Sequence, residues 1–144
     1  MITTYTESKN VAIFVDTGAW LALYDKDDHN HRIAKDTFRK IRDEHLPLFT
    51  SDYIFDETVT LIRHRVSHST ARSFGNNILE SRIVRFVDVT REDRTKAWEI
   101  FSKYKDVGFS FTDCTSFVIM KRLKLETVLA FDSHFKIMGF NLYV

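Results

Sequence analysis

The chain has 144 residues, of which 44% are hydrophobic and 28% charged, the composition of an ordinary globular protein. Its formal net charge of +1 gives no overall basic footprint for nucleic acid, although charge can be segregated on the surface. The single cysteine, Cys114, excludes an internal disulfide framework, and no apolar run reaches the length of a membrane helix. We therefore expect a cytoplasmic protein with a polar N-terminal segment over residues 1–10 and one domain over residues 11–144.

Short apolar runs alternate with segments of helical spacing along the chain. Strands are predicted at residues 11–15, 48–50, 83–87, 127–131 and 140–144. Helices are predicted at residues 19–24, 31–44, 52–66, 70–80, 90–104, 114–123 and 133–138. This alternation predicts an α/β fold, a three-layer α/β/α sandwich with a mainly parallel central sheet.

Polar residues at the helix starts indicate where three of these helices are capped. Ser51 or Asp52 is the expected cap of the helix over 52–66, and Thr90 with Asp93 fits a capping pattern for the helix over 90–104. For the apolar helix over 114–123, the expected opening residue is Thr112 or Asp113.

Three short apolar runs, at residues 11–15, 108–112 and 128–131, each end at an aspartate: Asp16, Asp113 and Asp132. Such runs are typical of buried strands or of the approach to a helix, and the residues after them are where open α/β sheets bind ligands. Taken singly, each aspartate is more simply explained as a helix N-cap. A fourth acid, Glu57, is more simply explained as an exposed helix residue. Their recurrence at equivalent positions favours one carboxylate cluster, which a divalent metal would neutralise.

Three motifs carry a resemblance to a known family. The run Phe-Val-Asp-Thr-Gly-Ala at 14–19 resembles the opening motif of PIN-domain nucleases. Ser-Phe-Thr-Asp at 110–113 is similar to the family's Ser-x-Thr-Asp turn before an apolar helix, and Ala-Phe-Asp-Ser-His-Phe at 130–135 matches its terminal motif. The resemblance spans about residues 11–143, and the layout is most similar to VapC-type toxins of toxin–antitoxin pairs.

The resemblance implies a metal-dependent endoribonuclease that uses Mg²⁺ or Mn²⁺, acts on RNA, pairs with a cognate antitoxin and forms a homodimer. It implies direct metal ligation by Asp16 and Asp113, and binding of a second metal or of metal-bound water by Glu57 and Asp132. The hydroxyls of Thr17 and Thr112 match positions that help to arrange the site. Because Asp56 stands where the family often has Asn, either Asp56 or Glu57 could face the site; they point about 100° apart on a helix, and we favour Glu57.

Other functions stay open or are excluded by single features. A non-catalytic PIN-like module that binds RNA or protein, or an RNA-processing nuclease without an antitoxin, remains an alternative. A phosphoacceptor receiver domain needs paired acids after its first strand, and a haloacid-type phosphatase needs an Asp-x-Asp motif at that place. This chain has only Asp16 after its first predicted strand, so both classes are excluded. His64 and His68 lack a third metal ligand nearby. We expect His134 near the rim of the site, Cys114 as a buried inert thiol, and Trp20 and Trp98 as core or interface rings.

Overall fold

The central sheet of the computed structural model is parallel throughout residues 11–144, the part of the chain that the structure describes. The predicted polar segment 1–10 lies outside the described residues. Neighbouring strands pair in the order β3-β2-β1-β4-β5, each pair in parallel register. The strands are β1 (Ile13–Val15), β2 (Leu48–Ser51), β3 (Val84–Val87), β4 (Thr127–Leu129) and β5 (Asn141–Leu142). The prediction of a mainly parallel sheet is confirmed.

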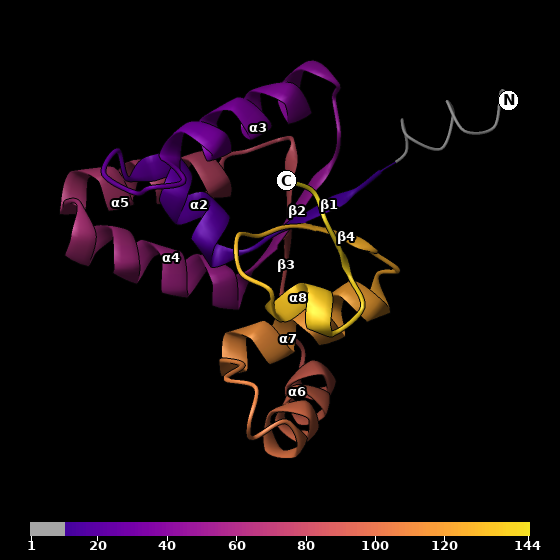
Figure 1. Ribbon diagram of the computed structural model, residues 1–144. Coiled ribbons are helices and arrows are strands. Elements are labelled where there is room, and N and C mark those ends of the chain that lie inside the picture. Colours follow the sequence, from indigo (N-terminus) through magenta and orange to yellow (C-terminus); the bar gives the residue numbers. More distant parts are fainter. Residues whose placement is uncertain (1–10) are drawn as a thin grey trace, which may run out of the picture.

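Helices connect the strands and cover both faces of the sheet. They are α2 (Thr17–Tyr24), α3 (His31–Asp43), α4 (Asp52–Arg65), α5 (His68–Leu79), α6 (Arg91–Lys103), α7 (Phe111–Arg122) and α8 (His134–Ile137). Figure 1 shows α2 to α5 gathered on one side of the strands and α6 to α8 on the other. Right-handed crossovers explain this, because the chain runs outward from β1 to β3 and then returns to β4. The predicted three-layer sandwich is therefore confirmed.

The predicted helices and strands all occur, but some boundaries differ. The helix expected from residue 70 begins at His68, because Ser67 Oγ accepts a hydrogen bond from the Thr70 amide at 3.0 Å and caps the helix. The prediction that Thr112 or Asp113 opens α7 was wrong. Ser110 is the cap: its Oγ accepts from the Asp113 amide at 2.9 Å, and Asp113 Oδ2 accepts from the Ser110 amide at 3.0 Å. This reciprocal pair is a capping box.

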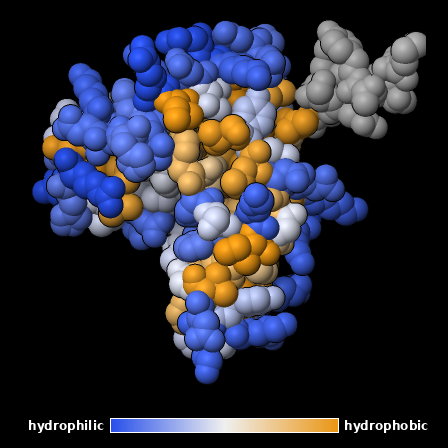
Figure 2. All heavy atoms as spheres, viewed as in Figure 1, coloured by the Kyte–Doolittle hydropathy of each residue, from blue (hydrophilic) through white to orange (hydrophobic). Residues whose placement is uncertain are grey.

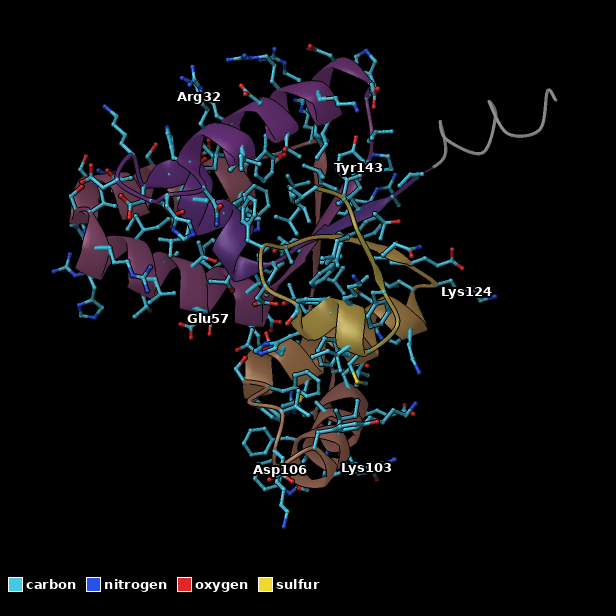
Figure 3. All side chains as sticks on the ribbon, viewed as in Figure 1. Arg32, Glu57, Lys103, Asp106, Lys124 and Tyr143 are labelled. Atoms are coloured by element: carbon cyan, nitrogen blue, oxygen red, sulfur yellow. The ribbon has the colours of Figure 1, made fainter. Side chains whose placement is uncertain are left out.

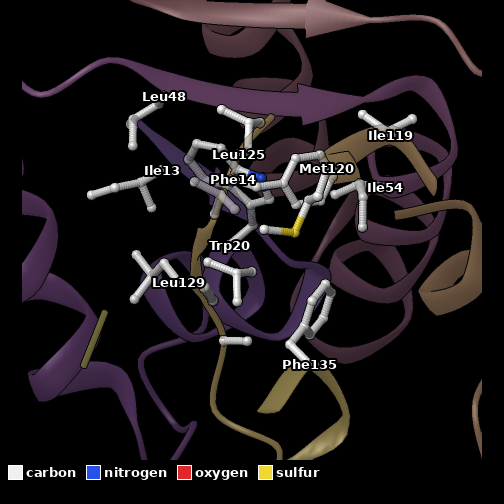
Figure 4. Packing of buried hydrophobic residues seen from close by; sticks show 14 of the residues in the cluster. Ile13, Phe14, Trp20, Leu48, Ile54, Ile119, Met120, Leu125, Leu129 and Phe135 are labelled. Atoms are coloured by element: carbon white, nitrogen blue, oxygen red, sulfur yellow. The ribbon is translucent and has the colours of Figure 1, made fainter. Parts of the chain in front are cut away.

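The core forms where the helices pack on β1 and β4 (Figure 4). Ile13, Phe14 and Val15 are fully buried, as expected for a central strand covered on both faces. The residues of α7 from Asp113 to Met120 are also buried, because α7 packs against α6, α4 and α8. Figure 2 shows hydrophilic side chains over α3 and α5, with hydrophobic ones in the middle of the view and over α8. None of the helices within residues 11–144 is both long and apolar enough to cross a membrane.

An ion pair fastens α6 to α7. Arg122, at the end of α7, donates through Nε to Asp93 Oδ1 at 3.0 Å and through Nη2 to Asp93 Oδ2 at 2.8 Å. Asp93 also closes the predicted capping box with Thr90, which the structure confirms. The Asp93 side chain is only 3% exposed, and the hydrogen bonds from Arg122 and Thr90 hold its pKa below the ordinary value despite burial. The pair therefore fixes where α6 lies against α7.

Candidate active site

The strand order reverses direction at the carboxyl ends of β1 and β4. The chain leaves β1 towards β2 on one side and leaves β4 towards β5 on the other, so the loops after these neighbouring strands diverge. Open α/β sheets bind their ligands at such a switch point. Asp16 directly follows β1, and Asp132 lies in the loop after β4. Two of the four predicted acids are therefore placed at this edge by topology alone.

The other two acids reach the same edge from helix starts. Asp113 lies in the first turn of α7, and Glu57 lies near the start of α4, which begins directly after β2. Figure 3 labels Glu57 near the end of α4 that approaches α7. The structure thus gathers Asp16, Glu57, Asp113 and Asp132 around one end of the sheet.

The pKa of Asp16 is shifted by the other acids of this cluster. Its side chain is buried, with 5% of the residue exposed, and no Lys or Arg among the described residues pairs with it. Burial raises the pKa of Asp16 well above 3.8, and the negative charges of Asp113, Asp132 and Glu57 raise it further. The backbone N–H of Thr17 acts in the opposite direction and lowers this pKa, but by less. Asp56 is exposed and has no part in this shift. The four carboxylates therefore share one field that disfavours negative charge and attracts cations.

His134 joins two of the acids. Its Nδ1 lies 2.9 Å from Asp113 Oδ2, where an Nδ1–H donates to the carboxylate, and 3.9 Å from Asp132 Oδ2. Its backbone amide donates to Asp132 Oδ1 at 3.0 Å. The ring also packs edge-on against Phe109, with centroids 5.4 Å apart. We expected His134 only at the rim; the His-Phe pair after Asp132 was the available signal for this closer role.

The simple N-cap explanation fits the aspartates poorly. Asp16 stands at the N-cap position of α2 but makes no side-chain capping hydrogen bond. Ser133, not Asp132, precedes α8, and Asp132 accepts a turn hydrogen bond from His134. Only Asp113 takes part in capping, as the third residue of its box, and it does so through Oδ2. Its Oδ1 accepts no hydrogen bond from residues 11–144.

One buried hydroxyl close to Asp16 has no partner. Thr17 Oγ1 is inaccessible to solvent and makes no hydrogen bond within the described chain. A buried hydroxyl without a partner costs free energy, which a ligand or ordered water can recover. Thr112 is half-buried, and its carbonyl accepts from the hydroxyls of Thr115 and Ser116 at 2.7 and 2.9 Å. Thr17 and Thr112 therefore flank Asp16 and Asp113, one on each helix start.

The donor set suits a hard divalent cation. Carboxylate and hydroxyl oxygens are the ligands that Mg²⁺ and Mn²⁺ prefer. As the side chains stand in residues 11–144, no three His, Cys, Asp or Glu groups lie close enough to hold one ion. The cluster fits an ion that takes one or two carboxylates and keeps water in its other positions, as Mg²⁺ commonly does.

Two other predicted side chains are placed by the structure. Cys114 is buried beside Asp113, and burial together with that neighbouring charge raises its pKa to about 11, as expected of an inert thiol. Trp20 is a core ring whose Nε1 donates to Thr50 Oγ1 at 3.3 Å, whereas Trp98 is 59% exposed.

Known proteins match this chain in sequence over most of its length. The family model that describes the PIN domain matches residues 13–141. The chain is 34% identical over 128 residues to the 23S rRNA-specific endonuclease VapC20 of Mycobacterium tuberculosis, covering 89% of this chain and 95% of that protein. It is 30% identical over 129 residues to a VapC ribonuclease of Archaeoglobus fulgidus, covering 88% of this chain and 81% of the relative.

Solved structures show the same architecture. The crystal structure of Mycobacterium tuberculosis VapC20, described as a toxin that cleaves the sarcin–ricin loop, aligns with a TM-score of 0.82 at 33% identity over 90% of this chain and 96% of that one. VapBC2 from Rickettsia felis, bound to a DNA fragment of its promoter, aligns with a TM-score of 0.67 at 10% identity over 92% and 97% of the two chains, which shows the fold alone. The chain belongs to the PIN domain family.

Proposed function

We propose that this chain is a Mg²⁺- or Mn²⁺-dependent endoribonuclease and the toxin of a toxin–antitoxin pair. The observation that carries the proposal is the gathering of Asp16, Glu57, Asp113 and Asp132 at one end of the sheet, where burial and the neighbouring carboxylates raise the pKa of Asp16. The 34% identity to a 23S rRNA-specific endonuclease over most of both chains supports RNA as the substrate. A sarcin–ricin loop hairpin is therefore the first RNA to test.

Asp16 and Asp113 are the residues that we assign to hold the metal directly. Asp16 lies in a buried position where an ionic attraction is weakly screened, and Asp113 keeps Oδ1 free of hydrogen bonds within the described residues. His134, donating to Asp113 Oδ2, fixes the orientation of that carboxylate. Glu57 and Asp132 complete the negative rim and would bind a second cation or orient water.

The reaction is the hydrolysis of a phosphodiester. The oxygen of water forms a bond to phosphorus, the P–O3′ bond breaks in line, and the products carry a 5′-phosphate and a 3′-hydroxyl. A bound divalent metal would supply Lewis-acid stabilisation and lower the pKa of water. The Thr17 hydroxyl, which has no partner in the described chain, is assigned to donate to a phosphate or carboxylate oxygen. We assign the Thr112 hydroxyl a similar role.

The cleavage test uses purified protein and the hairpin RNA with Mg²⁺, Mn²⁺ or EDTA. We expect cleavage with either metal and none with EDTA, and loss of cleavage in Asp16→Asn and Asp113→Asn. Glu57→Gln should reduce cleavage strongly, whereas Asp56→Asn, its exposed neighbour, is the matched control and should cut normally. Normal cleavage by Asp16→Asn would show that the site is misassigned. Absence of Mn²⁺ binding in calorimetry would favour a non-catalytic module.

The partners follow from the same proposal. The relative described as a toxin supports a cognate antitoxin for this chain, and we expect a homodimer. A small neighbouring gene whose product copurifies with this chain and abolishes cleavage would support the antitoxin. An isolated gene, with no inhibitor found, would favour an RNA-processing nuclease. Light scattering tests the dimer, and a strictly monomeric protein would refute it.

A further inference from the structure

Three arginines lie close to the turn that joins α4 to α5. Arg63 and Arg65 are in the last turn of α4, and Arg72 is in the second turn of α5. The two helices pack against each other, and Figure 1 shows the turn between them at the far left of the view. All three arginines are exposed. We call Arg63, Arg65 and Arg72 the turn arginines.

The turn arginines have no acidic partner within residues 11–144. None of them forms a salt bridge in that part of the chain. The segment 58–79, which contains all three, has no aspartate or glutamate, although the whole chain has 20 acidic residues against 21 lysines and arginines. The near-neutral net charge therefore conceals a local excess of positive charge at this turn.

The acids on neighbouring elements lie away from the turn. Those of α4 and α7 stand near the starts of these helices, at the carboxylate site, and α2, β2 and β3 contain none. Glu80 follows the other end of α5. Residues 25–28 include three aspartates, and Asn77 Nδ2 holds the start of this loop near the same end of α5 by donating to the Tyr24 hydroxyl at 2.9 Å. These acids border the two helices but do not neutralise the turn arginines.

A surface hollow of about 470 Å³ extends along α5 from the turn. Every side chain that lines it can donate a hydrogen bond, and none is a carboxylate: His68, Ser69, Arg72, Ser73, Asn76 and Asn77. They form two rows at a spacing of four residues, so successive members of a row lie about 6 Å apart along the helix. We call this the donor hollow. Its donors suit an anion with several oxygens, such as phosphate.

The turn lies on the helix that also carries Glu57. Glu57 and His64 are seven residues apart on α4, so they share a helix face about 10 Å apart along its axis. The carboxylates at the Glu57 end repel an RNA backbone, so the attraction that binds RNA must come from another surface. Arg63 and Arg65, beside His64, provide unpaired positive charge within a few nucleotides of the carboxylate site.

We propose that the turn arginines and the donor hollow bind backbone phosphates of the RNA on one side of the cleavage point. This inference rests on the proposed function. Phosphate contacts fix the position and orientation of a nucleic acid without reading its sequence, so this surface holds the RNA while the acids meet the bond to be cut. The donor hollow has none of the large apolar side chains that anchor a protein partner, which favours RNA over an acidic protein.

The salt dependence of RNA binding tests this surface. A fluorescently labelled sarcin–ricin loop hairpin is titrated with the full chain in EDTA, where binding is separated from cleavage, at several salt concentrations. Arg65→Gln and Arg72→Gln should each lower the slope of log affinity against log salt by about 0.8, which corresponds to roughly tenfold weaker binding at 50 mM salt. Arg72→Lys keeps the charge and should retain the slope.

A control variant separates a phosphate contact from a change in net charge. Lys35 is exposed on α3 and forms no salt bridge within the described part of the chain. Lys35→Gln removes the same charge as Arg72→Gln and should bind RNA with the wild-type slope. Thermal melts check that each variant is folded, and the substituted side chains are all exposed.

Three results would overturn the RNA surface. The first is wild-type affinity and slope in both glutamine variants, and the second is an equal loss in Lys35→Gln, which would assign the effect to net charge. The third is loss of a copurifying antitoxin with unchanged RNA binding, which would assign the turn to a protein partner. Each leaves the nuclease proposal standing if the wild type cleaves RNA with metal. Weaker RNA binding by the arginine variants, in a protein that cleaves RNA with no metal, would instead support the surface and contradict the nuclease.

Discussion

Arg122→Ala should destabilise the fold by removing the clamp between α6 and α7. Asp93 is 3% exposed in its side chain and accepts two hydrogen bonds from Arg122, at 3.0 and 2.8 Å. Without the guanidinium, this buried carboxylate keeps only the Thr90 groups of its capping box. The loss therefore includes the cost of leaving a buried charge unpaired as well as the loss of the contact itself.

The geometry sets the size of the effect. Breaking a buried ion pair by removing one partner costs about 3–5 kcal/mol. The Arg122 side chain is 40% exposed, so solvent screens part of the interaction, and we expect about 2–3 kcal/mol. For a domain of this size that corresponds to a fall in Tm of roughly 8 °C. Arg39→Ala is the matched control: its pair with Asp36 is 3.6 Å long and exposed on both sides, and its loss should cost under about 0.5 kcal/mol.

Urea unfolding at several pH values distinguishes this mechanism from a general packing defect. The pKa of Asp93 is lowered from 3.8 in the folded chain, so the stability that the pair contributes is present above pH 3.8 and is lost as pH falls through the lowered value. The difference between wild type and Arg122→Ala should therefore be largest near pH 7 and shrink below pH 4. A difference that does not change with pH would refute the reasoning.

Three further outcomes are expected from the carboxylate site. Asp16→Asn should raise the Tm of the protein in EDTA near neutral pH. Because the pKa of Asp16 is raised in the folded chain, ionising this residue destabilises the wild type as pH rises above 3.8, and asparagine avoids that penalty. Calorimetry should therefore show that the difference in Tm disappears in acid. Mn²⁺ should stabilise the wild type in thermal shift assays, by about 2.7 kcal/mol at one hundred times its Kd, and should stabilise Asp16→Asn far less. Cys114, with its pKa raised to about 11, should react with a thiol reagent at pH 8 only after unfolding.

The spacing of hydroxyl and acidic residues indicates where two helices of this fold begin. The Thr90 and Asp93 box stands in the structure as the sequence indicated. Ser110 and Asp113 have the same spacing and form the same box, yet we expected Thr112 or Asp113 as the cap. In a capping box the hydroxyl residue is the N-cap and the acid three residues later is its partner, so the Ser110–Asp113 spacing indicates Ser110 as the cap.

Long-range features could not be read from local spacing. His134 meets Asp113 across 21 residues, and only the placement of α8 after β4 brings them together. Helical periodicity grouped Ala97, Trp98, Ile100 and Phe101 as one apolar stretch, but it does not say which side of a wide apolar face is covered. Ala97 is buried and Trp98 exposed, because α7 covers only one side of α6.

The two capping boxes of this fold show what makes an acid available for chemistry. Asp93 and Asp113 occupy the same position in equivalent boxes, and both are nearly buried. Asp93 gives both oxygens to Arg122, so its charge is neutralised and its role is structural. Within residues 11–144, Asp113 pairs with His134 through Oδ2 and with no lysine or arginine, and its charge instead raises the pKa of Asp16. The capping box orients the carboxylate in both cases. Whether an arginine then pairs with that carboxylate decides whether it stabilises the fold or is available to bind a cation.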